Sequence, residues 1–459
     1  MIPFLRKGHG GVLLIIIGGL LLRLTVLALK YNSLELDASF VVQGELARNI
    51  LNGRGLVVNQ QHISTILQTW RSTSTLVDLE DIPPPSSEYL EPEYFNEPGY
   101  GLLLAGLWKI FGQRWISIRL LQILIDTGMI FLMFTMGMCV WNRTTGLFAA
   151  GLYAVLIPQI ELAVRPHRDA WVTFAFIVST FFLLQLTLSR QKRKEVLIAV
   201  GIAFVVALTA WLRSTILVYV VVLALTMFFL KSFRRATMLS AIVITVFVAL
   251  LSPLLVRNCT AFGKFMVTRG AVWHSFWAGV GQFRNPYGMK ESDEFIVKYF
   301  QQRYPSAHYG TPEYEDVLKD KALKLLSEHP WWYASTVFRR AAVIISPKIG
   351  RETFFEDSSR PTNTGILNVG LSRWILLLID GLMVATLLTG FWLCRKKWRL
   401  ALLVALPLVY TLLTLSPFYV VGRNIMNIYF VTLIFAAVSF DFLIQKVETR
   451  FRVAQSEEV

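Results

Sequence analysis

Long apolar segments alternate with short polar connections along most of the 459-residue chain. Each apolar segment is about twenty residues long, which as an α-helix crosses the roughly 30 Å hydrocarbon core of a bilayer. The pattern predicts ten membrane-spanning helices. They cover residues 11–30, 115–140, 144–164, 169–188, 195–213, 215–231, 236–257, 371–394, 400–420 and 426–445. The predicted fold class is an all-α polytopic membrane protein.

Two shorter segments, 36–51 and 99–112, are apolar on one side and too short to cross a bilayer comfortably. Their composition predicts two juxtamembrane helices on the outer surface, in the first outer loop. A second long outer loop, 257–370, follows the seventh span, and residues 312–329 within it have the apolar spacing of a helix. A Trp-Trp-Tyr sequence comes next, which is typical of the membrane interface.

These segments divide the chain into three predicted units. Residues 1–257 form a seven-span module whose first outer loop covers 31–114. Residues 258–370 form an outer, periplasmic loop subdomain, and residues 371–459 form a C-terminal three-span bundle with a cytoplasmic tail. The first apolar run is too long for a cleaved signal peptide, so we expect a permanent span there.

Composition agrees with a membrane protein, because 54% of the residues are hydrophobic and only 16% are charged. The net charge of +15 comes from 45 Lys and Arg against 30 Asp and Glu. Basic residues concentrate in the connections 189–194, 231–235 and 395–399 and in both terminal segments. By the positive-inside rule these parts, including both termini, face the cytoplasm. Orientation and contact with anionic lipid therefore account for the charge, and no nucleic-acid partner is expected.

Common catalytic signatures are missing from the sequence. It has no P-loop, HExxH, GxSxG or CxxC motif, and its three cysteines are scattered. The predicted cytoplasmic connections are too short to hold a nucleotide-binding domain. Chemistry is therefore expected at the outer face or within the membrane, where an activated group would arrive on a lipid.

The polar residues that could carry chemistry lie at the outer ends of the predicted spans and in the outer loops. They are Glu35, Asp37, Glu97, Arg119, Arg165, His167, Arg168, Asp169, Arg213, Arg257 and Arg423. Arginine keeps its charge and binds phosphate oxygens through two parallel N–H bonds. A neighbouring carboxylate can take a proton from an acceptor hydroxyl while arginines stabilise the leaving phosphate. The set favours glycosyl transfer from a polyprenyl-phosphate sugar.

Several candidates also have a structural explanation. Arginines at span ends, such as Arg119 and Arg213, commonly extend towards the lipid headgroups. Asp37 and Asp169 precede or begin helices, where a carboxylate caps or complements the helix N-terminus. A tight turn holds Arg423, which makes the phosphate-binding interpretation stronger there.

The remaining polar residues point less clearly to a particular function. Glu35 and Glu97 are expected to be solvated, and His167 with Asp169 forms only a weak metal signal. No cofactor is expected with certainty, and a divalent metal ion stays an open alternative. Ionisable groups inside a membrane are costly, and pairing within the bundle is favoured for the two aspartates predicted there. The charged residues within the predicted spans are Arg23, Asp126 and Asp380.

Several different short motifs follow one another along most of the chain. They are Leu36-Asp37, ARNILNGRG at 47–55, EPGY at 97–100 with a following apolar run to FG at 111–112, Arg168-Asp169, Pro253 with Arg257-Asn258, and Gly422-Arg423-Asn424. Together with the seven spans and two surface helices, they resemble the GT-C membrane glycosyltransferases. The resemblance is to the class that includes protein O-mannosyltransferases and lipid A aminoarabinose transferases.

The resemblance implies an inverting hexosyl or pentosyl transfer from a polyprenyl-phosphate sugar donor. Asp37 would be the general base, and Asp169 would orient the acceptor or a bound cation. Arg257 and Arg423 would hold the donor phosphate, with Arg168 and His167 nearby. The acceptor would be a lipid, a glycan or a protein, and loop 257–370 would cover its site. The residues expected to support the site are Glu35, Glu97, Arg165, Arg213 and Arg119.

Two other functions stay open. The first is a transporter or flippase of lipid-linked sugars, although such proteins commonly show paired halves and this sequence shows no internal repeat. The second is a non-catalytic scaffold that keeps the fold. Short connections between spans and the lack of an ER retrieval signal favour a multi-pass protein of a prokaryotic plasma (inner) membrane.

Overall fold

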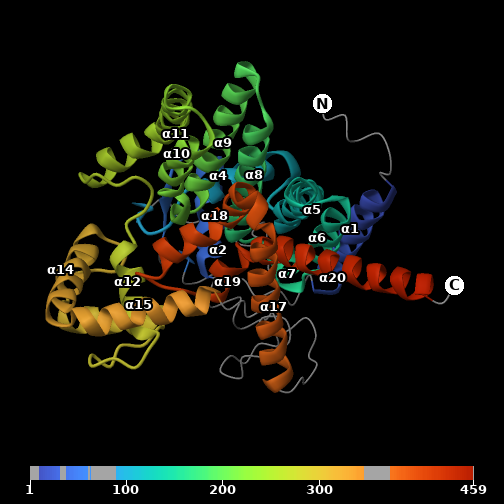
Figure 1. Cartoon of the computed structure of the whole chain (residues 1–459). Helices are drawn as coiled ribbons and strands as arrows, with labels where there is room; N and C mark the ends of the chain where they lie inside the picture. The colour runs from blue at the N-terminus through green and yellow to red at the C-terminus, as the bar shows by residue number, and fades with distance from the viewer. Residues whose placement is uncertain (1–9, 31–37, 60–61, 64–88, 346–372, 458–459) are drawn as a thin grey trace.

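The computed structural model describes residues 10–30, 38–59, 62–63, 89–345 and 373–457, and these parts are mainly helical (Figure 1). Two short strands, β1 (Val57–Val58) and β2 (Glu91–Pro92), pair antiparallel. The α-helices are α1 (Gly10–Lys30), α2 (Ala38–Leu51), α4 (Gly99–Phe111), α5 (Trp115–Val140), α6 (Arg143–Val155), α7 (Ile157–Val164), α8 (Asp169–Leu188), α9 (Lys192–Leu212), α10 (Tyr219–Leu230), α11 (Phe233–Phe262), α12 (Val272–Gly281), α13 (Asp293–Arg303), α14 (Pro312–Glu328), α15 (Pro330–Ile345), α17 (Arg373–Leu393), α18 (Trp398–Leu415), α19 (Gly422–Met426) and α20 (Tyr429–Glu457).

The polytopic helical fold predicted from hydropathy is confirmed. Among the described residues, seven helices are long and apolar enough to cross a membrane, or eight if the bent pair α6 and α7 is one span. One of the seven, Leu378–Leu415, overlaps the two predicted spans 371–394 and 400–420, and the predicted span 215–231 falls on the shorter apolar stretch Ser214–Leu230. The total of ten spans stays a prediction.

The bend of 56° between α6 and α7 is held by a buried ion pair. Pro158 near the start of α7 cannot donate a backbone hydrogen bond, which favours a helix break there. Arg23 donates to the freed carbonyl of Ala154 and lies 2.6 Å from Asp126. Tyr153 donates to the same carboxylate. The predicted pairing of Asp126 within the bundle is confirmed. The positive charge of Arg23 and the negative charge of Asp126 cancel each other.

The largest core lies between the long helices. It joins residues of α5, α6, α8, α9, α10 and α11 with residues of α18 and α20. Helix α20 packs against both α6 and α17, and α18 packs against α8. The C-terminal helices therefore pack directly on the first part of the chain, and their division into a separate bundle stays a prediction.

The two short helices predicted at 36–51 and 99–112 are present as α2 and α4, and their location at the membrane surface stays a prediction. They pack against each other so closely that a Cβ atom on Gly101 would lie 2.7 Å from Leu46. Gly99 at the start of α4 lies against the backbone of Trp211, where a Cβ would meet the carbonyl oxygen at 2.4 Å. This contact places the segment before α4 at the end of α9.

Helices α12 to α15 form a smaller core beside the bundle, towards the lower left of Figure 1. Helix α14 confirms the helix predicted at 312–329. Helix α15 buries Arg340, whose guanidinium donates to the carbonyls of Ser416 and Gly279. It exposes Trp331 and Phe338, seven residues apart and so on one face.

Candidate functional site

Polar residues from separate segments meet at one end of the bundle. Helix α8 begins where the antiparallel helix α9 ends, and Arg213 Nε lies 2.9 Å from Asp169 Oδ1. The segment before α4 brings Glu97 to the same place, and α19 brings Arg423. We call this group the arginine cluster. It consists of Glu97, His167, Arg168, Asp169, Arg213, Ser214, Arg269 and Arg423.

Glu97 is fully buried and binds two arginines at once. Arg168 Nη1 lies 2.6 Å from Oε2, and Arg269 Nε lies 3.1 Å from Oε1. The backbone N–H and hydroxyl of Ser214 also donate to Oε1. Burial alone raises the pKa of Glu97, but the surrounding guanidiniums, Arg269 foremost, outweigh it and hold this pKa well below its usual range. The expectation that Glu97 is solvated is wrong, because its segment packs onto the end of α9.

Asp169 is the second buried carboxylate of the cluster. Arg213 approaches Oδ1, whereas Arg423 Nε and His167 Nδ1 lie 3.6 Å and 3.3 Å from Oδ2. Among the described residues, neither oxygen of Asp169 accepts a hydrogen bond. The Asp169 carboxylate thus lies among cationic side chains, and both of its oxygens can still accept hydrogen bonds from a bound ligand.

The arginine cluster carries more positive than negative charge. Four guanidiniums face two carboxylates, so the excess is two positive charges when His167 is neutral. The side chains of Arg168, Arg213 and Arg269 are 15% exposed or less, whereas that of Arg423 is 40% exposed. The surplus charge is therefore offered to solvent mainly through Arg423, which makes the cluster suitable for an anion.

A hydrogen-bonded chain fixes the loop that holds the cluster. Gln122 on α5 donates to the carbonyl oxygen of Arg165 at 2.9 Å and accepts from the hydroxyl of Tyr100 on α4 at 2.8 Å. Gln43 on α2 donates to the backbone carbonyl of Glu97 at 3.0 Å. Helix α4 is thus tied through Gln122 to the loop between α7 and α8, and α2 is tied to the backbone of Glu97.

Other predicted site residues lie outside the cluster's contacts. Arg257 donates to the carbonyls of Leu56 and Glu93, and so ties α11 to the paired strands. Arg165 pairs with Glu161, one helical turn before it. Arg119 is fully buried in α5, where its charge acts on the hydroxyl of Tyr100. The predicted base Asp37, like Glu35, lies outside the described residues.

Arg269 is a member of the cluster that the sequence did not indicate. It follows α11 in an irregular stretch, where no hydrophobic period fixes the direction of a side chain. The backbone brings it inward, because Gly270 N–H donates to the Tyr94 carbonyl and leaves no room for a side chain at position 270. In the sequence, the only signal for Arg269 was the glycine that follows it, Gly270.

A metal site would need more ligands than the described part of the cluster supplies. Among the described residues, no group of three or more His, Cys, Asp or Glu side chains is arranged to hold an ion. His167 and Asp169 give two donors, and the arginines around them disfavour a cation. The divalent-ion alternative stays untested because Asp37 is not among the described residues.

The arrangement of spans, surface helices and charged cluster can be compared with known proteins. The chain shares its fold with an archaeal oligosaccharyltransferase. The structure of AglB from Archaeoglobus fulgidus, in complex with an inhibitory peptide and a dolichol-phosphate, matches with a TM-score of 0.53 and 13% sequence identity. The match covers 98% of this chain and 52% of the other. The apo form of the Archaeoglobus fulgidus oligosaccharyltransferase matches with a TM-score of 0.52 at 11% identity, over the same shares.

This likeness concerns the backbone. The chain spans about half the length of the oligosaccharyltransferases it matches. No protein-family model and no curated protein sequence matches it. The shared architecture is thus that of a GT-C membrane glycosyltransferase, at an identity that establishes the fold alone.

Proposed function

We propose that this protein is a membrane glycosyltransferase that moves a sugar from a polyprenyl-phosphate donor to an acceptor on the outer face, with inversion. The observation that carries the proposal is the arginine cluster, which adds two surplus positive charges to the GT-C fold. The dolichol-phosphate bound to AglB supports a lipid-linked donor. Its bound peptide supports a protein as one of the three acceptor classes.

The charge of the cluster suits the proposed reaction better than simple binding. A sugar phosphodiester donor carries one negative charge. When the sugar leaves, the remaining phosphate monoester carries nearly two. Fixed guanidiniums around the leaving oxygen therefore interact more strongly with the transition state than with the donor, and this difference accelerates the reaction.

The roles divide by exposure and contact. Arg423 is the most exposed arginine of the cluster and would bind the donor phosphate, with His167 3.4 Å from its Nη1. Glu97 would hold Arg168 and Arg269 in place. Among the described residues, Arg168 makes its contacts with Glu97 and Asn96 through Nη1, and Arg269 makes its contacts with Glu97 and Ser214 through Nε. Their other N–H groups can therefore bind phosphate oxygens.

The general base is proposed to be Asp37. It directly precedes α2, which donates from Gln43 to the backbone of Glu97. Asp169 would orient the acceptor or a bound cation, since both of its oxygens retain hydrogen-bonding capacity. Arg257, first expected at the phosphate, is better suited by its two backbone contacts to fixing the strand segment beside Glu93.

The test compares membrane glycolipids and glycoproteins by mass spectrometry in a host that lacks the gene. The host carries the wild type, Asp37→Asn, Arg423→Ala or the control Arg284→Ala at matched expression. Arg284 is an exposed outer-loop arginine outside the cluster. We expect one sugar mass on a product with the wild type and the control, and its loss with the other two variants.

Two results would contradict parts of the proposal. Full product with Asp37→Asn would remove Asp37 as the base and direct the search to Asp169 or Glu35. An unchanged glycan profile in all strains would reject the transferase and favour a transporter of lipid-linked sugars. The prokaryotic inner membrane, with both termini in the cytoplasm, is proposed as the location and can be checked with terminal reporter fusions.

A further inference from the structure

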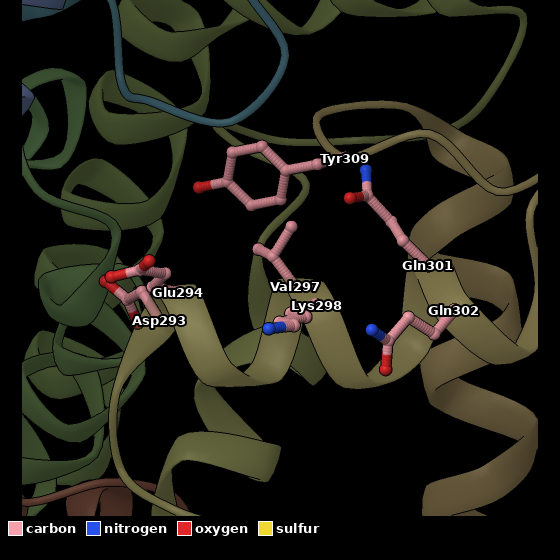
Figure 2. Close-up of a pocket in the computed structure, with 7 residues that line it drawn as sticks. All are labelled: Asp293, Glu294, Val297, Lys298, Gln301, Gln302 and Tyr309. Carbon is pink, nitrogen blue, oxygen red and sulfur yellow. The ribbon is translucent and has the colours of Figure 1, made fainter.

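A hollow of about 650 Å³ lies on the outer side of α13, and the proposed chemistry does not use it (Figure 2). Most of the residues that line it are polar, but much of the surface they present to the hollow is apolar and comes from aliphatic stems and the Tyr309 ring. The residues that line it are Asp293, Glu294, Val297, Lys298, Gln301, Gln302 and Tyr309. In Figure 2 the two acidic residues stand at one end, the two glutamines at the other, and the Tyr309 ring faces α13 across the space.

One wall of the hollow continues into the arginine cluster. The ring of Tyr309 packs against Phe95, with centroids 4.7 Å apart. Phe95 is two residues before Glu97, and Asn96 between them accepts a hydrogen bond from Arg168. A molecule in the hollow would therefore lie against the segment that carries a buried carboxylate of the cluster.

Tyr419 connects the chain next to the hollow with the segment that precedes Arg423. The hydroxyl of Tyr419 donates to Glu291, two residues before Asp293 at the rim. The backbone N–H of Val420 donates to Oε1 of Gln282, directly after α12, at 3.2 Å. Burial and the Glu291 hydrogen bond raise the pKa of Tyr419, and Asp293 raises it while Arg423 lowers it. Tyr419 is thus within electrostatic reach of both the hollow and the cluster.

The lining has the chemistry of a carbohydrate site. Each glutamine offers a donor and an acceptor, and each carboxylate can accept from two neighbouring hydroxyls. The exposed Tyr309 ring, at 41% exposure, offers a flat apolar face for the C–H side of a sugar ring. Asp293 is held by His274, whose Nε2 lies 3.1 Å from Oδ1, so its direction is fixed.

A peptide would find fewer partners here. Extended peptides bind by adding a strand to an exposed sheet edge, or place side chains in apolar pockets. The hollow is lined by a helix and a loop, and in the described parts of the chain the strands are only two residues long and lie elsewhere. Val297 is its only aliphatic lining residue. The lining therefore favours hydroxyl groups over a peptide backbone.

We propose that the hollow on α13 is the acceptor subsite and that its ligand is a glycan, whose hydroxyl-bearing end reaches the arginine cluster along Phe95 and Tyr419. This inference rests on the proposed function and specifies its acceptor class. In this proposal, helices α12 to α15 recognise the acceptor, and the arginine cluster binds the donor and carries out the transfer step.

The test uses the full-length protein in lipid nanodiscs, with host polyprenyl-phosphate sugars as the donor. Two acceptor pools from the host, released glycans and envelope proteins, are offered separately. The variants are Gln301→Ala/Gln302→Ala and Tyr309→Ala, with Tyr309→Phe keeping the ring. The matched control is Lys319→Ala/Asp320→Ala, two exposed positions on α14 outside the hollow.

We expect transfer to the glycan pool with the wild type. Loss of the two amides should raise the acceptor KM about tenfold and leave kcat and the donor KM unchanged. Tyr309→Ala should behave likewise, whereas Tyr309→Phe and the control should match the wild type. Two results would overturn the acceptor inference alone. The first is donor consumption with product only on protein. The second is donor consumption with an acceptor KM that does not change in the hollow variants. No donor consumption by the wild type would overturn the proposed function and this inference with it.

Discussion

Replacing Arg423 by alanine should separate phosphate binding from stability. The side chain of Arg423 is 40% exposed, and its contacts with His167 and Asp169 are 3.4 Å and 3.6 Å long. These contacts are long and partly solvated, so their loss should cost the fold little. The phosphate, in contrast, would lose a charge-assisted hydrogen bond from a guanidinium.

The size of the effect follows from that bond. A hydrogen bond to a charged group contributes about 1.5 to 3 kcal/mol, which corresponds to a fall in kcat/KM of about 10- to 150-fold. Arg423→Lys should recover part of it, because lysine keeps the charge and loses the planar fork. Arg213→Ala is the contrasting variant, since Arg213 is 7% exposed and lies 2.9 Å from Asp169.

The assay measures donor turnover and thermal unfolding on the same nanodisc samples. Arg423→Ala should lower kcat/KM for the donor at an unchanged unfolding temperature, whereas Arg213→Ala should lower both. The reasoning is refuted if Arg423→Ala unfolds as readily as Arg213→Ala. It is also refuted if Arg423→Ala keeps full turnover at donor concentrations below KM.

Three further predictions follow from other charged or exposed groups. Glu97→Gln should lower the unfolding temperature at pH 7, because it leaves Arg168 and Arg269 buried without their carboxylate. The pKa of Glu97 is lower in the folded state than in the unfolded chain. The difference in unfolding temperature from the wild type should therefore shrink as the pH falls below about 4. Burial raises the pKa of Glu315 in α14 to about 7. Between about pH 4.5 and 7 the unfolded chain therefore binds fewer protons than the folded protein, and the unfolding temperature should fall as the pH rises through this range. Glu315→Gln should flatten this slope, and an equally steep slope in the variant would contradict the prediction. Phe338 on α15 is 74% exposed beside the predicted interfacial aromatics, so Phe338→Asp should weaken contact with the bilayer and reduce quenching of nearby tryptophans by brominated lipids, whereas the exposed polar change Lys319→Ala should not.

Hydropathy and helical spacing were sufficient to predict the elements. Spans and surface helices depend on which residues are apolar over ten to twenty positions, and that information is local in the sequence. Helices α2, α4 and α14 therefore appear where the pattern placed them. Counting along the predicted spans also placed Asp169, Arg213 and Arg423 at one depth, and the structure brings these three together.

The neighbours of each residue could not be predicted in the same way. Distance from a span end gives the depth of a side chain in the membrane, but not the side of the helix or the partner helix that it faces. Glu97 and Arg257 illustrate this difference. Glu97, expected to be solvated, is buried between Arg168 and Arg269. Arg257, predicted to hold the phosphate, donates to the backbone carbonyls of Leu56 and Glu93 beside the paired strands, which its place at the end of a span did not indicate.

The sequence by itself thus determined the class of fold, the two short helices α2 and α4, and the end of the bundle where Asp169, Arg213 and Arg423 lie, because each depends on the apolar or polar character of a short segment. The tertiary structure decided which charges share a site and how many remain in excess. Those depend on contacts between segments far apart in the chain, such as Arg269 with Glu97 and Arg423 with Asp169. Close packing at Gly99 and Gly270 makes these contacts possible, since a side chain at either position would push the segments apart.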